Sequence, residues 1–134
     1  MVAYAEDAVD YARDAFGFEL DFTPGSIEYV ELMADQLYVP RPMRLLRILR
    51  IGPSGEDKAR MCKMLGGYVG EVYRRVKGGD WAINPELGVL GVQKGDSWVF
   101  PPTKVHKRLT NGAEDNLLSY FHVVSAPSFP DGLA

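Results

Sequence analysis

The apolar positions of the N-terminal third follow helical spacing and predict two helices. Residues 2–16 carry apolar side chains at steps of three and four with acidic residues between them, and Gly17 follows where a C-terminal cap belongs. Residues 18–22 alternate apolar and acidic positions, which predicts a short extended connector. Thr23-Pro24 then predicts a helix start with a capping hydroxyl and a proline at the first helical position. This second helix must end before Pro40.

The middle of the chain predicts a long central helix over residues 54–77. Three glycines interrupt it at positions 66, 67 and 70, each at a cost of about 1 kcal/mol relative to alanine, so we expect a neighbouring element to approach closely there. The preceding segment, residues 41–51, has an arginine at every third position and predicts a short helix. The apolar stripe of the central helix comprises Cys62, Leu65, Val69, Val72 and Val76.

Beyond Gly78-Gly79 the pattern changes to short runs separated by turn residues. Residues 80–83, 88–93 and 97–100 predict an antiparallel β-meander. A short basic helix from Pro101 and a last helix capped by Asn111 and Glu114 complete the chain. With no repeat or linker, the sequence predicts one α+β domain over residues 1–126 and a frayed C-terminal tail over 127–134. Its order is N-terminal helices, a long central helix, a small antiparallel β-meander and C-terminal helices.

Charge changes this picture because it is distributed unevenly. The formal net charge is only −3, yet residues 1–37 hold nine acidic side chains and one basic, and residues 38–78 hold ten basic and three acidic. Either the two segments fold together and neutralise each other, or one face stays uncompensated and steers a charged partner. The candidates for partner binding are Asp7, Asp10, Asp14, Arg44, Arg47 and Trp81.

Composition excludes several classes of site. One cysteine excludes a disulfide framework, and with two histidines it leaves no plausible metal centre. The chain shows no signal peptide and no apolar run long enough to span a membrane, so we expect a cytoplasmic protein without a cofactor. The glycines at 66, 67 and 70 match neither a P-loop nor a dinucleotide fingerprint, and we expect them to serve helix packing. No nucleophile motif is present, and no residue is assigned as catalytic.

Two stretches resemble a family of small bacterial cytosolic proteins of unknown function. Residues 64–81 resemble its LGxYxGEVxRR…GGxW pattern, and residues 100–120 are similar to its PxxKVxKRLxNGxED pattern. The resemblance implies a compact bacterial α+β domain of the accessory or immunity type rather than a known enzyme. The chain departs from the family in residues 41–50, which are not typical of it, and at Asn116, where the pattern has serine.

Three functions follow as hypotheses. The first is a non-enzymatic protein-binding domain, an immunity-type inhibitor that docks through a charged surface. The second is a small enzyme or ligand-binding domain, with a pocket formed where two distant segments converge. The third is nucleic-acid binding through the segment Arg41–Arg50, against which the sequence pI of about 5.3 argues. A homodimer through open sheet edges is a further option. The pocket of the second hypothesis would be built from Glu71, Arg74, Arg75, Lys104, His106 and Arg108.

Overall fold

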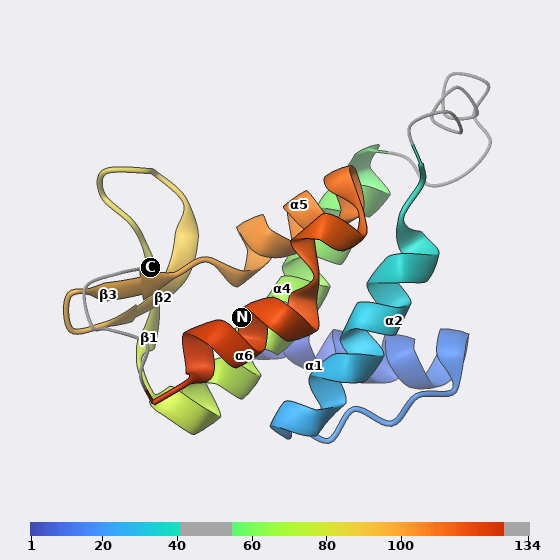
Figure 1. Ribbon diagram of the computed structural model, residues 1–134, viewed down its shortest axis with the longest axis horizontal. Coiled ribbons are helices and arrows are strands. Elements are labelled where there is room, and N and C mark those ends of the chain that lie inside the picture. The colour runs from blue at the N-terminus through green and yellow to red at the C-terminus, as the bar shows by residue number, and fades with distance from the viewer. Residues whose placement is uncertain (41–54, 128–134) are drawn as a thin grey trace.

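The computed structural model describes residues 1–40 and 55–127 of the chain (Figure 1). The predicted helix over residues 41–51 and the candidates Arg44 and Arg47 lie outside the described residues. Among the residues that are described, helices surround one long central helix and a small antiparallel sheet lies at one end, so the fold is α+β as predicted. No helix of the described part is long and apolar enough to cross a membrane.

The helical elements follow the predicted order. Helix α1 (Val2–Tyr11) continues through a π-helical turn, η1 (Ala12–Phe16), and Gly17 caps it in the left-handed conformation at φ 71°, as predicted. The short turn η2 (Pro24–Ser26) leads into α2 (Ile27–Leu37). The central helix α4 spans Gly55–Lys77. Helix α5 (Pro101–Asn111), the turn η4 (Ala113–Asp115) and α6 (Leu117–Ser125) close the described chain.

The sheet is the predicted meander. Strands β1 (Asp80–Ile83), β2 (Leu90–Lys94) and β3 (Ser97–Val99) pair in the order β1-β2-β3, and both pairs are antiparallel. The register places Trp81 opposite Val92 and Val92 opposite Val99. Residues paired across neighbouring strands lie on the same face of the sheet, so Val92 and Val99 both turn to the core, where each is at most 2% exposed.

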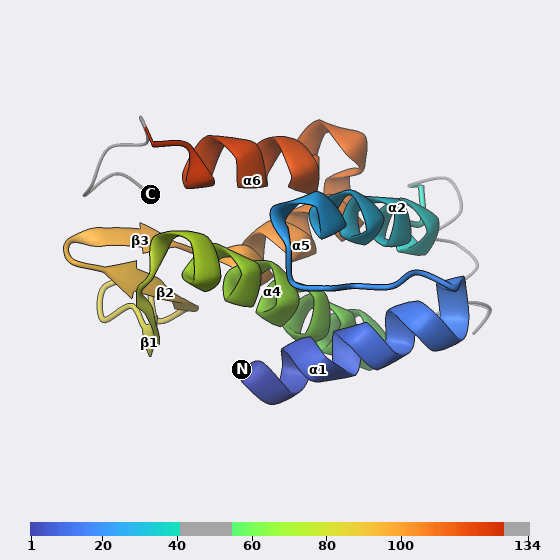
Figure 2. The ribbon, with the colours of Figure 1, turned by 90° about the horizontal axis from the view of Figure 1, so that it is seen from below.

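The core forms on all sides of α4. Figure 2 shows α1 on one side of the central helix, with α2 and α6 on the other side and α5 close beside it. The stripe of α4 is buried as predicted from Cys62 to Val72, but the prediction for Val76 was wrong, because this residue lies in the last turn of α4 and is 46% exposed. The side chains that other helices contribute to this core include Ala5, Ala8, Ala12, Ile27, Val30, Met33, Val105, Leu117 and Phe121.

Two predicted helix caps were wrong. The Thr23 hydroxyl accepts no hydrogen bond from the first turn of η2 and instead donates to the Asp21 carboxylate at 2.6 Å, although Pro24 does take the first helical position. The last helix starts later than predicted, because α5 ends just before Gly112, where φ is 93°, and residues 113–115 form a separate turn. Asn116 is the cap of α6, and its side chain accepts a hydrogen bond from the Ser119 amide at 2.9 Å.

Candidate functional site

The acidic side chains of α1 face solvent because the opposite side of the helix packs on α4. Ala5 and Ala8 of α1 and Ala12 of η1 are fully buried, and small side chains allow the two helices to approach closely. Asp7, Asp10 and Asp14 therefore project outward, and all three are exposed. Within the described ranges their ion pairs are those of Arg13, with Asp10 at 2.8 Å and with Asp14 at 3.6 Å.

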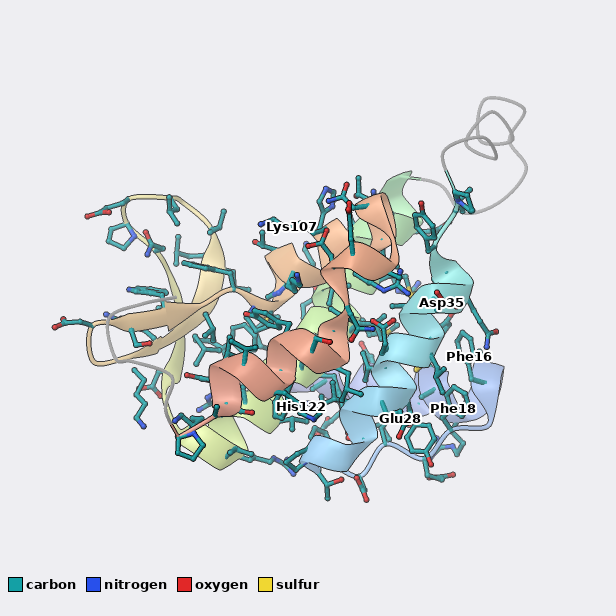
Figure 3. All side chains as sticks on the ribbon, viewed as in Figure 1. Phe16, Phe18, Glu28, Asp35, Lys107 and His122 are labelled. Atoms are coloured by element: carbon teal, nitrogen blue, oxygen red, sulfur yellow. The ribbon has the colours of Figure 1, made fainter. Side chains whose placement is uncertain are left out.

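A ladder of four aromatic rings adjoins these acids. Tyr11, Phe16, Phe18 and Tyr29 form this aromatic ladder, with successive ring centroids 5.6, 5.8 and 5.1 Å apart. The left-handed Gly17 reverses the chain between Phe16 and Phe18, so that their rings stack at an interplanar angle of 16°. Figure 3 shows Phe16 and Phe18 on the side of the molecule that carries α2. The ladder is accessible, since three rings are half-buried and Tyr29 is 41% exposed.

Acidic residues border the ladder, and Arg13, which pairs with Asp14, is the cation recorded near them in the described residues. Asp14, Glu19 and Glu28 each lie within two residues of a ladder residue in the sequence, and all three are exposed. For residues 1–40 and 55–127, the structure shows no ion pair at Glu19 or Glu28. The acids of α1 together with these residues and the aromatic ladder are called the acidic–aromatic surface below. The sequence predicted the acids but missed the ladder, for which the only local signal was the Phe-Gly-Phe run at the end of α1.

Glu71, a candidate for the hypothetical pocket, is buried. It is 5% exposed and accepts hydrogen bonds from Arg74 at 2.8 Å and from the Trp81 indole at 2.7 Å. The Trp81 ring lies over Gly70, where an added Cβ would come within 2.3 Å of it. Arg74 also donates to the Gly79 carbonyl at 2.9 Å. These contacts hold β1 against α4. The Trp81 N–H and the Glu71 carboxylate therefore have their hydrogen-bond partners inside the protein.

The six residues of the hypothetical pocket lie in different surroundings. Glu71 and Arg74 belong to the cluster at β1, whereas the Arg75 guanidinium lies 3.9 Å from the centre of the Phe22 ring. His106 is exposed and near Lys58, and partial burial together with that ammonium group lowers the pKa of the imidazole. Lys58 and Glu71 are thirteen residues apart on α4, about 20 Å along the helix axis. Glu71 and His106 therefore do not share a pocket.

Arg108 is fully buried and joins three helices. Its guanidinium donates to both carboxylate oxygens of Glu31, at 2.8–3.0 Å, and to Asp35 at 2.8 Å. These hydrogen bonds raise the pKa of Arg108 against the opposing effect of burial. Glu31 also accepts the Leu117 amide at the start of α6, at 2.9 Å. The structure thus assigns Arg108 to an internal clasp of α2, α5 and α6.

Lys104, by contrast, lines an open pocket of about 150 Å³. Lys104 comes from α5 and also pairs with Asp115 at 2.9 Å. The other residues that line this pocket are Val99, Phe100, Thr103, Lys107 and Tyr120. Sequence reasoning missed Tyr120, because only the packing of α6 against α5 brings it to this pocket.

Tyr68 holds the connector between α1 and α2 in place. Its buried hydroxyl accepts the Phe22 amide at 2.8 Å and hydrogen-bonds the Ser26 hydroxyl. Phe22 has a positive φ of 62°, a strained conformation for a residue other than glycine. The contact with Tyr68 therefore helps to fix a strained corner.

We expect the substitution Tyr68→Phe to lower the free energy of unfolding by about 1–3 kcal/mol, because it leaves the half-buried Phe22 amide without its acceptor and removes one of the two hydrogen bonds of the buried Ser26 hydroxyl. Urea denaturation followed by circular dichroism measures the loss. Tyr4→Phe is the matched control, since Tyr4 is 36% exposed and should change stability little. Equal stability of both variants would contradict a role for the Tyr68 hydroxyl in holding the connector.

The described residues contain no cluster of side chains suited to bind a metal ion. No three His, Cys, Asp or Glu side chains of residues 1–40 and 55–127 lie together so that they could hold a metal ion. Cys62 is buried on α4, and this burial raises the pKa of its thiol. A thiol in that state is a poor nucleophile at neutral pH.

Comparisons with models of known protein families, with curated proteins and with solved structures give no match for this chain. Function is therefore inferred from the geometry of the described residues.

Proposed function

We propose that the protein is a non-enzymatic protein-binding domain that docks on a basic surface of a partner protein through the acidic–aromatic surface. The observation that carries the proposal is the coincidence of exposed acids with an accessible ladder of aromatic rings. An inhibitor of the immunity type, which covers a basic active-site cleft, is the class of binding protein that this surface fits.

The charge of the surface supports a basic partner. Arg13 and Arg108 are the cations that form ion pairs with acids of residues 1–37, as far as the described residues go. The remaining acids keep their charge exposed, and such a field accelerates encounter with a cationic surface at low ionic strength.

The aromatic ladder supports a protein rather than a small cation as the partner. Tyrosine and phenylalanine rings supply apolar contact area at the centre of interfaces, and charged residues usually occupy the rim. Ring faces also attract guanidinium and ammonium groups, so the ladder and the acids favour the same arginine- or lysine-rich partner. Nucleic acid is disfavoured, since this surface repels phosphate.

Charge reversal tests the proposal. We expect the triple variant Asp7→Lys, Asp10→Lys, Asp14→Lys to slow association with the partner roughly tenfold at low salt and to flatten its salt dependence. The partner is first isolated on immobilised wild-type protein with elution by a salt gradient, and stopped-flow fluorescence then measures the association rate.

The control carries the same change of charge elsewhere. Glu86→Lys, Asp96→Lys and Glu114→Lys replace exposed acids outside α1 and α2, and this triple variant should associate at close to the wild-type rate. Both triple variants should retain the wild-type circular dichroism spectrum. If the two variants slow association equally, net charge alone is responsible and the docking surface is placed wrongly.

A further inference from the structure

We infer that the pocket between α5 and α6 binds a small organic monoanion with an apolar body about the size of a benzene ring. This inference is independent of the proposed protein-binding surface. Figure 3 places Lys107 on α5, away from the ladder residues Phe16 and Phe18.

The size of the pocket sets the size of the ligand. Its volume is about 150 Å³, and an apolar cavity of roughly that volume accommodates benzene. Val99, Phe100 and the ring of Tyr120 supply apolar walls. Burial raises the pKa of the Tyr120 hydroxyl, so the wall that it forms is uncharged at neutral pH.

The polar groups of the pocket select an anion. Thr103 and Lys107 are one turn apart on α5, so their side chains lie on one face of the helix. In the described part of the chain, neither the Thr103 hydroxyl nor the exposed Lys107 ammonium has a hydrogen-bond partner or ion pair of its own. A carboxylate at the mouth of the pocket would find one hydroxyl donor and the net positive charge of two lysines set against one aspartate.

The second lysine limits the ligand to one negative charge. Lys104 pairs with Asp115 at 2.9 Å, and its ammonium nitrogen is 5.6 Å from the centre of the Tyr120 ring. Hydrogen bonds from Lys104 and Asn111, with a weaker contribution from the charge of Lys107, lower the pKa of Asp115, which therefore stays ionised beside both lysines. Two lysines and one aspartate leave one positive charge to balance a ligand, and a dianion would exceed it.

Benzoate is a suitable probe because it combines one carboxylate with a benzene ring. We expect it to bind wild-type protein with a Kd of roughly 1 mM, as a fragment of this size allows. In an ¹H–¹⁵N NMR titration, the amides of Thr103, Lys104 and Lys107 should shift in a saturable way. Acetate, which lacks the ring, and benzyl alcohol, which lacks the charge, should bind more weakly.

The variant Lys107→Gln separates specific binding from general charge. We expect it to raise the Kd of benzoate about fivefold and to leave that of benzyl alcohol unchanged. The matched control Lys63→Gln, an exposed lysine of α4 that does not line the pocket, should leave both affinities as in the wild type. Absence of saturable shifts, equal benzoate affinity in wild type and Lys107→Gln, or shifts confined to other elements would each overturn the inference.

Discussion

Replacing Arg108 with methionine will lower the free energy of unfolding by about 3–5 kcal/mol, because it leaves a buried carboxylate without its cation. Arg108 is 0% exposed and the Glu31 side chain is 13% exposed, so water cannot take over the lost hydrogen bonds. Glu31 would keep only the Leu117 amide as a donor. Chemical denaturation of Arg108→Met against wild type measures the loss.

Two further variants separate the contributions of the exposed and the buried partner of Arg108 to the free energy of unfolding. Asp35→Asn removes the exposed partner, whose side chain is 65% exposed, and should cost less than about 1 kcal/mol. The double variant Arg108→Met, Glu31→Met removes both buried charges and should recover part of the loss, since a buried ion pair is often replaceable by apolar side chains. If Arg108→Met alone were as stable as wild type, the clasp would contribute nothing to the fold.

The substitution Gly70→Ala will destabilise the protein by roughly 1–3 kcal/mol, although alanine favours a helix over glycine by about 1 kcal/mol. The added methyl group would lie 2.3 Å from two carbon atoms of the Trp81 ring. The ring cannot move away freely, because its N–H donates to the buried Glu71. Displacing Trp81 would therefore also remove a hydrogen bond from a buried carboxylate.

A double-mutant cycle with Trp81→Phe tests this steric cause. Phenylalanine lacks the outer ring atoms that the methyl group would meet, so the double variant should be more stable than the sum of the two single losses predicts. Gly67→Ala is the comparison within the same helix, since its Cβ would meet Tyr4 at 3.1 Å and requires only a small adjustment. Additive losses, or a larger effect at Gly67 than at Gly70, would contradict the account.

Local pattern was sufficient for most of the fold. The three main helices, the left-handed cap at Gly17 and the order of the meander were predicted because spacing and turn residues act over a few positions. The same reasoning placed Thr23 and Asn111 as helix caps and was wrong. Both side chains hydrogen-bond a nearby aspartate instead, Thr23 with Asp21 and Asn111 with Asp115. Val76 was misassigned because periodicity gives the face of a helix but not how far its neighbours extend.

The candidate site was only partly predictable. Helical spacing put Asp7, Asp10 and Asp14 on the solvent side, but the ladder joins rings from α1, the connector and α2, and only the fold brings them together. The burial of Glu71 was not predictable from local pattern, because it depends on Trp81 ten residues further on. The three glycines did signal a close approach, and Pro102 and Trp81 prove to be the neighbours at Gly66 and Gly70.

The clasp of Arg108 also determines when the protein can fold during synthesis. Arg108 and Glu31 are 77 residues apart in the chain, and Leu117 follows Glu31 by 86. At about 5–20 residues per second, a ribosome adds the intervening residues in roughly 4–15 s. Until then the carboxylate of α2 has no cation and the apolar side of α2 lacks the cover of α6. The nascent chain therefore completes this core only after α6 has been made, and until then residues 1–37 must remain soluble on the strength of their own negative charge.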